Sequence, residues 1–357
     1  MAEPTDLFPL TRRDLLVGAG LSLAVGSTGP AVAAAVAPDP RVVVIVLCGG
    51  ADGLSLVPPV GDPDIRRLRP ALAESGQLPL DGFFALPAAL PAIHARYRAG
   101  EALVAHAVGT GAPSRSHQIA LQRLGTGPHG AGWLVALAPV VAPHRRVVTV
   151  GDRPSGLTDG ATSRLYLPPE AVTALSLDRL VALSDARRGG RTLSVAAPHR
   201  RQASTVDIAR ALGTLLAAPD GPRLAVLDLP GWDTHAAQER TLARPLADLD
   251  TAVAALAETL APVWTSTVMA VVTEFGRTVA LNAAGGTDHG TGTAAMILGG
   301  SVRGGRVLAD WPGLSAPALH EGRDLRATRN VHAVLASAID DALAPGLTRS
   351  AFPDGLV

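Results

Sequence analysis

The chain has 357 residues, of which 47% are hydrophobic and 17% are charged. This composition excludes a disordered chain and allows one large α/β domain or two smaller ones. The formal net charge is zero, so the chain has no overall field to attract nucleic acid, and no nucleic-acid partner is expected. Cys48 is the only cysteine, which excludes an intramolecular disulfide, and its place after an apolar run predicts a buried, inert thiol.

Three features near the N-terminus occur in the order of a signal peptide. The pair Arg12-Arg13 precedes the apolar stretch Leu15–Val25, which is shorter than the roughly 20 residues of a membrane span. Ala31-Val32-Ala33 then fits an A-x-A cleavage site. The pattern resembles a twin-arginine translocation (Tat) signal, the route for proteins exported already folded. The alternative is an amphipathic helix with a chance arginine pair.

We therefore predict a Tat signal peptide over residues 1–33, recognised by the Tat translocase, and a mature protein over residues 34–357. The mature protein would be periplasmic or extracellular. No other segment is long and apolar enough for a stable membrane span.

Strand-like and helix-like segments alternate along the mature chain. Strands are predicted at residues 41–47, 102–108, 146–150, 223–229, 267–273 and 293–298. Helices are predicted at residues 91–98, 133–141, 205–217, 236–260 and 328–343, and a further helix follows Ser114–His117 and runs through residue 124. This alternation predicts an α/β fold with a mainly parallel central sheet and helices on both faces. Residues 34–357 would form a single domain, with a cap or excursion at 155–201, where periodicity is weak.

Three polar clusters lie next to predicted strands. They are Asp52 within Gly49–Gly53, Asp233-Thr234-His235, and Asp288-His289 in a glycine-rich loop. Open α/β sheets bind ligands at the carboxyl ends of their strands. Carboxylate and imidazole groups are metal ligands, so a site for divalent metal ions is predicted from Asp52, Asp233, His235, Asp288 and His289.

Each cluster also has a purely structural interpretation. Asp52 could cap a short helix, and Asp233 could cap the long helix predicted after it, because aspartate accepts hydrogen bonds from first-turn amides. Asp288-His289 could be a simple turn. The three clusters together favour a metal site, because two metals acting on a phosphate or sulfate ester need both carboxylates and imidazoles.

A fourth cluster, Ser114-Arg115-Ser116-His117, follows the strand at 102–108. Ser116, or Ser114, could be an activated hydroxyl nucleophile, with His117 orienting the substrate or moving a proton. Arg115 could hold an oxyanion with its two-pronged guanidinium. The alternative is that both serines are helix caps. Glu274, after a later strand, could be a further ligand or could orient one.

These motifs resemble the domain of unknown function 1501 (DUF1501) family of Tat-exported bacterial proteins, and they cover nearly the whole mature chain. The matching segments are Leu47–Ser55, Ser114–His117, Gly231–His235, Glu274–Thr278, Gly286–Gly290, Gly304–Val307 and Asp310–Leu314. The family looks related to the alkaline phosphatase and sulfatase superfamily. That resemblance implies an alkaline phosphatase-like core, with Asp52 as the first-strand metal aspartate. In the sulfatase pattern, however, Gly111 occupies the nucleophile position.

The resemblance implies an exported metal-dependent hydrolase of phosphate or sulfate esters, acting on a small molecule or a polymer. Zn, Mg and Ca are the candidate metals, and Ser116, Ser114 or a metal-bound water is the candidate nucleophile. Two alternatives stay open. One is a non-catalytic exported binding protein that keeps the fold. The other is a structural exported partner in which the clusters are only caps and turns.

Overall fold

The computed structural model describes residues 39–74, 76–111, 114–127, 132–151, 156–158, 164–188, 192–195 and 203–352. The predicted signal peptide, residues 1–33, lies outside the described residues, so the predicted boundary at residue 34 stays a prediction. Among the described residues, no helix combines the length and apolar character that crossing a membrane requires.

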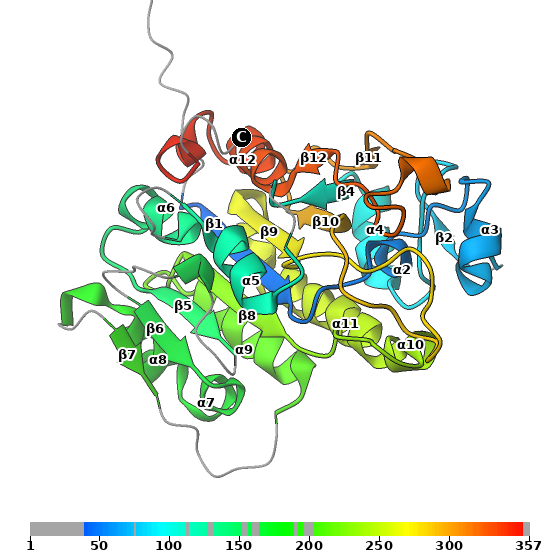
Figure 1. Ribbon diagram of the computed structural model, residues 1–357. Helices are drawn as coiled ribbons and strands as arrows, with labels where there is room; N and C mark the ends of the chain where they lie inside the picture. The colour runs from blue at the N-terminus through cyan, green and yellow to red at the C-terminus, as the bar shows by residue number, and fades with distance from the viewer. Residues whose placement is uncertain are drawn as a thin grey trace, which may run out of the picture. The chain divides into compact units, whose positions relative to one another are not determined.

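A large mixed sheet forms the centre of the fold (Figure 1). Its strands are β1 (Arg41–Leu47), β4 (Ala102–Gly109), β5 (Val147–Val150), β6 (Arg164–Leu167), β7 (Thr192–Ser194), β8 (Leu224–Leu229), β9 (Thr267–Val272), β10 (Thr293–Leu298), β11 (Arg306–Leu308) and β12 (Arg329–Asn330). The spatial order is β11-β4-β10-β9-β1-β8-β5-β6-β7, and β12 pairs with β4. Within the described residues of this sheet, only the strand pairs that β10 makes with β4 and β9 are antiparallel. The predicted mainly parallel sheet is confirmed.

Helices cover both faces of the sheet, and a small hairpin of β2 (Leu78–Pro79) and β3 (Ala85–Leu86) stands apart. The α-helices are α2 (Gly53–Leu56), α3 (Ile65–Leu68), α4 (Pro91–Arg98), α5 (His117–Gly125), α6 (Trp133–Val141), α7 (Pro169–Ala174), α8 (Leu177–Ser184), α9 (Thr205–Ala217), α10 (Gln238–Thr241), α11 (Ala243–Thr259) and α12 (Val331–Ala342). Short 3₁₀ helices are Pro70–Ala73, Gly156–Thr158, Ala186–Arg188, Ala261–Ser266, Ala316–Ala318 and Leu347–Ser350.

Strand β1 shows why both faces are covered. All seven of its residues are buried, and alternate side chains of a strand point to opposite faces. Val43, Ile45 and Leu47 pack in the core that also contains residues of α4, α9 and α11. Val42, Val44 and Val46 pack in a second core with residues of α6 and α12. The continuous β-branched run is therefore a strand buried on both sides.

Two predicted segments differ in detail. The helix predicted over 236–260 is two helices, α10 and α11, which meet at Leu242. Pro245 lies in the first turn of α11, and its missing N–H cannot continue the hydrogen bonds of α10. The segment 155–201, predicted as a cap or excursion, carries β6 and β7, which extend the main sheet by parallel pairing.

Candidate metal centre

The direction of the strands brings three motif loops to one edge of the sheet. Strands β1, β8 and β9 are parallel neighbours, so the loops that follow them lie at the same edge. Strand β10 is antiparallel to β9, so its beginning lies at this edge, together with the preceding loop that holds Asp288 and His289. Strand β4 pairs antiparallel with β10, which brings the loop after it, and His117 at the start of α5, to the same place.

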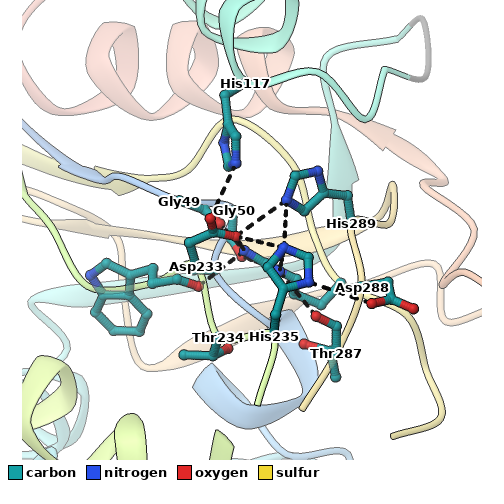
Figure 2. Close-up of polar contacts among 12 residues, drawn as sticks. Gly49, Gly50, His117, Asp233, Thr234, His235, Thr287, Asp288 and His289 are labelled. Atoms are coloured by element: carbon teal, nitrogen blue, oxygen red, sulfur yellow. Dashed lines mark hydrogen bonds and ion pairs between the residues drawn. The ribbon is translucent and has the colours of Figure 1, made fainter. Parts of the chain in front are cut away.

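Asp233 is the centre of the cluster, and three imidazoles approach its carboxylate (Figure 2). The Nε2 atoms of His235 and His289 lie 3.0 Å and 3.2 Å from its Oδ1 atom. The Nε2 atom of His117 lies 3.7 Å from its Oδ2 atom. Ligand atoms of His117, Asp233 and His289 all lie within 4.8 Å of one another, a spacing that one metal ion can bridge.

A hydrogen-bond acceptor lies next to the Nδ1 atom of each of the three imidazole rings. Glu274 Oε1 lies 2.9 Å from Nδ1 of His117, and the carbonyl oxygen of Arg115 lies 2.8 Å from Nδ1 of His289. Asp288 Oδ1 lies 3.4 Å from Nδ1 of His235. Carboxylate and carbonyl oxygens only accept hydrogen bonds, so each Nδ1 donates to its acceptor and each Nε2 is left to face Asp233. Metal-binding histidines have this arrangement in proteins.

The same cluster brings two ring nitrogens close together. Nε2 of His235 and Nε2 of His289 are 3.0 Å apart, and both face Asp233. This distance requires a proton on one of the two nitrogens or a cation between them, because two lone pairs would repel each other. Arg277 adds positive charge here, because it donates to Asp233 Oδ1 and lies 3.5 Å from His235 Nε2. A set of imidazole nitrogens and one carboxylate is a fitting donor set for zinc or a similar transition metal, whereas Mg and Ca prefer oxygen ligands.

The charges around the cluster shift three pKa values. The hydrogen bond to Glu274 raises the pKa of His117. Partial burial pushes the pKa of Asp233 upward, but hydrogen bonds from Arg277 and His289 hold it below its usual range. The hydrogen bond from Asn282 is the main cause that lowers the pKa of Asp288. Both aspartates are therefore ionised at neutral pH.

Arg277 and the Asp233 loop both lie against the glycine pair Gly49-Gly50. Its buried guanidinium donates to the carbonyl oxygens of Gly49 and Gly50 as well as to Asp233. Gly49 has a φ of +124°, and a Cβ atom there would lie 2.5 Å from the backbone nitrogen of Asp233. Only glycine lets the backbone come this close to the Asp233 loop.

Asp52 lies outside this cluster. Its side chain is 1% exposed and pairs at 2.9 Å with Arg69, which is itself buried. It also caps α2 by accepting a hydrogen bond from the backbone nitrogen of Leu54. The structure thus favours the capping interpretation for Asp52. The same interpretation is wrong for Asp233, because α10 begins later and its N-cap residue is Ala237.

Two of the predicted catalytic residues, Arg115 and Ser116, also differ in their contacts. Both Nε and Nη of Arg115 donate to Asp324, and Nη also donates to Glu321. Arg115 therefore has no free fork for an oxyanion, contrary to the sequence expectation, and it contributes its carbonyl oxygen to His289 instead. Ser116 is exposed at the N-cap position of α5 and makes no capping hydrogen bond with its side chain.

Ser114 borders a cavity of about 270 Å³ beside the cluster. Glu274 and Phe275 line the cavity, and both also contact His117. Arg326 and His320 also line the cavity, and Arg326 gives its wall a positive charge. Among the described residues, Ser114 is thus the predicted hydroxyl that faces an open space next to the imidazoles.

The sequence predicts a catalytic role for His117, whereas its Nε2 atom lies with the candidate ligands. Arg277 and Gln238 are not among the residues that the sequence predicts for the site. Arg277 follows β9 in a segment that also carries Glu274, so its place after a strand was the available signal. Gln238 carries no such signal, because a neutral amide in a helix is common on a protein surface.

Comparison with known proteins gives a family and weak structural likenesses. The model of the family described as "Protein of unknown function (DUF1501)" matches residues 145–338, more than half of the chain. No curated protein sequence matches this chain.

Three solved structures illustrate the structural likenesses. The Zn complex of the C-terminal periplasmic domain of EcEptC from Escherichia coli shares 11% identity over 74% of this chain and 76% of that chain, with a TM-score of 0.39. Phosphonate monoester hydrolase of Agrobacterium radiobacter shares 13% identity over 75% and 70%, with a TM-score of 0.38. Ps i-CgsB in complex with k-i-k-neocarrahexaose shares 12% identity over 77% and 69%, with a TM-score of 0.40. All three TM-scores are below 0.5, so the reactions of these proteins are not carried over to this chain.

Proposed function

We propose that this chain, which belongs to the DUF1501 family, is an exported metal-dependent hydrolase of phosphate or sulfate esters. The observation that carries the proposal is the convergence of the Nε2 atoms of His117, His235 and His289 on the carboxylate of Asp233. Each ring is oriented by an acceptor on its other nitrogen. These residues would hold one divalent metal ion, with zinc favoured by the imidazole-rich donor set.

A divalent metal at this position supplies a Lewis acid that polarises an ester oxygen. Side chains of this protein would supply the other groups that the reaction needs. Ser114 would present its hydroxyl from the cavity wall, and the buried carboxylate of Glu274 would keep His117 in one orientation. Arg326, on the same cavity, would attract the anionic ester. Ser116 is the second candidate hydroxyl, because it directly precedes His117.

Export by the Tat translocase to the periplasm or beyond is part of the same proposal. It is supported by the order of Arg12-Arg13, the short apolar stretch and the small residues up to Ala33. Replacing Arg12 and Arg13 together by lysine should keep the protein inside the cell, as shown by fractionation of cells that produce it. Unchanged export of this variant would refute the Tat route.

The central test is metal analysis of the purified wild-type protein, followed by assays on aryl phosphates and aryl sulfates. We expect about one divalent metal ion per chain and ester hydrolysis that a chelator abolishes. The Asp233→Asn variant should lose both. Asp248→Asn is the matched control, because Asp248 pairs only loosely, at 3.5 Å, with exposed Arg244 on α11. Wild-type protein that binds no divalent metal would refute the proposal.

The occupied guanidinium of Arg115 favours one alternative function. Its ion pairs with Asp324 and Glu321 remove the group that sequence reasoning assigned to the oxyanion. A non-catalytic binding protein would keep the metal and lack turnover. Stoichiometric metal together with no hydrolysis on either panel would support this alternative over the hydrolase.

A further inference from the structure

One buried amide joins all three of the polar clusters found in the sequence. Gln238, the first residue of α10, is 1% exposed. Its Nε2 atom donates to Asp52 Oδ2 at 2.6 Å and to Ser55 Oγ at 3.2 Å. Its Oε1 atom accepts from the hydroxyls of Thr234 and Thr287. The four contacts use both ends of the amide.

The two threonines belong to the loops that carry the candidate ligands. Thr234 lies between Asp233 and His235, and Thr287 directly precedes Asp288. Both threonines are buried, and the backbone nitrogen of Thr287 donates to the carbonyl oxygen of Thr234 at 3.0 Å. A shift of Gln238 would therefore move both loops, and with them the imidazoles of His235 and His289.

The anchor of this amide is the ion pair of Asp52. Arg69 donates to Asp52 Oδ2 at 2.9 Å, and its other nitrogens donate to the carbonyl oxygens of Thr278 and Val279. A carboxylate only accepts hydrogen bonds, so it fixes Nε2 of Gln238 toward itself and leaves Oε1 for the threonines. A glutamate carboxylate could not make both sets of contacts, because the oxygen in place of Nε2 would face the Asp52 carboxylate as a second acceptor.

We propose that Gln238 is a positioning residue that holds the two ligand-bearing loops in register, and that Asp52 anchors it instead of binding metal. We name Asp52, Arg69, Gln238, Thr234 and Thr287 the Gln238 clamp. The proposal rests on the metal centre of the proposed function. It also accounts for the aspartate of the Gly49–Gly53 motif, whose carboxylate is saturated by donors.

The test compares Gln238→Met with Asp250→Asn in the full mature protein. Methionine keeps the length of the side chain and removes all four hydrogen bonds of the Gln238 amide. Asp250 is a matched control, because it is a buried polar residue that accepts from the backbone nitrogens of Ala92 and Ile93 at the start of α4. We expect Gln238→Met to weaken zinc binding by about 10- to 100-fold, as for residues that orient ligands, at an unchanged stoichiometry of zinc per chain.

The Asp250→Asn variant should bind zinc as wild type does, even when its thermal stability falls by a similar amount. Equal zinc affinity in Gln238→Met and wild type would overturn the clamp. A Gln238→Glu variant with wild-type zinc affinity would also overturn the clamp, because a glutamate carboxylate cannot donate to Asp52.

Hydrogen exchange gives a readout that does not depend on metal. In zinc-free protein, Gln238→Met should speed the exchange of backbone amides in peptides that contain Thr234 and Thr287, and Asp250→Asn should not. Unchanged exchange in both peptides would overturn the clamp even if the wild type binds no zinc. Zinc-free wild type would refute the proposed function, whereas normal zinc affinity in the variant would refute only the clamp.

Discussion

Asp52 and Asp233 follow neighbouring parallel strands in similar glycine-flanked motifs, yet their surroundings differ. Asp52 is 1% exposed in its side chain and accepts from four donors, those of Leu54, Ser55, Arg69 and Gln238. The side chain of Asp233 is 50% exposed, and three imidazoles and the guanidinium of Arg277 surround it. A buried carboxylate saturated by donors has a structural role, whereas an exposed one among imidazoles can bind a cation. Burial and the type of neighbours separate the two roles.

The largest expected effect is on stability and concerns Asp52, the buried aspartate of this comparison. Arg69→Met would leave the carboxylate of Asp52 buried without its counter-charge. Breaking such a pair costs about 3–5 kcal/mol of the free energy of unfolding, measured by urea denaturation. Arg67→Met is the control, because the Arg67–Asp64 pair is exposed and should contribute less than about 1 kcal/mol. Equal losses in the two variants would contradict the contrast drawn between Asp52 and Asp233.

Near Asp233, the exposed aspartate of the comparison, removing one imidazole should weaken metal binding. His289→Ala deletes the ring that lies 3.2 Å from Asp233 Oδ1. We expect zinc affinity to fall by more than the roughly 100-fold seen at most for orienting residues, with ester hydrolysis lost. A competition assay with a zinc-binding dye measures the affinity. His94→Ala on α4 is the control, and a fall of the same size there would show that His289 has no special role.

The orienting carboxylates should differ from each other in strength. Glu274 is buried and lies 2.9 Å from His117 Nδ1, whereas Asp288 is 55% exposed and lies 3.4 Å from His235 Nδ1. We expect Glu274→Gln to weaken zinc binding by about 10- to 100-fold, and Asp288→Asn by less than about tenfold, because water can replace an exposed partner. The same dye assay ranks the two. The reverse order would contradict the assignment of His117 as a ligand.

Another expected effect, per pH unit similar in size to a tenfold change in affinity, is a pH dependence of stability that arises at the buried residue His106. Burial lowers the pKa of His106 from 6.5 to about 4, and its Nε2 atom lies 2.9 Å from the carbonyl oxygen of Val57, the C-cap residue of α2. Between these pH values the unfolded chain binds a proton that the folded protein does not. Stability should therefore fall as pH falls through this window, with a slope of about 1.4 kcal/mol per pH unit from this group.

His106→Gln removes the titrating group, so its free energy of unfolding should depend less steeply on pH between 6.5 and 4. Urea denaturation at several pH values measures both slopes. Parallel curves for wild type and variant would show that His106 keeps its proton in the folded protein.

Much of the fold could be predicted because local patterns determine it. The predicted bounds of β1, α4, α6, α9 and β10 are those of the structure. An unbroken β-branched run marks β1. Serine at position 204 accepts a hydrogen bond from the backbone of Asp207, and such a cap marks the start of a helix. Local signals of this kind are complete within a few residues, so a single sequence contains them.

The candidate site could be predicted only in part, because its partners are distant in sequence. Adjacent strand ends correctly suggested that Asp233, His235 and His289 meet. Nothing near Asp52 indicates Gln238, which is 186 residues away, and nothing near Arg115 indicates Asp324, at a separation of 209 residues. Whether a polar side chain is free or engaged depends on such contacts, and composition and spacing do not contain them.

The insertion of β10 between β4 and β9 has a consequence for the growing chain on the ribosome. Strands β4 and β9 are synthesised before β10 and do not pair with each other in the finished sheet. His289 lies four residues before the first residue of β10, so it can take its place only when β10 has closed the gap between its two neighbours. An incomplete chain that ends before β10 would contain all three imidazoles but would bring at most two of them into place. Metal capture should therefore follow synthesis of most of the chain, after the sheet has closed around its last central strand.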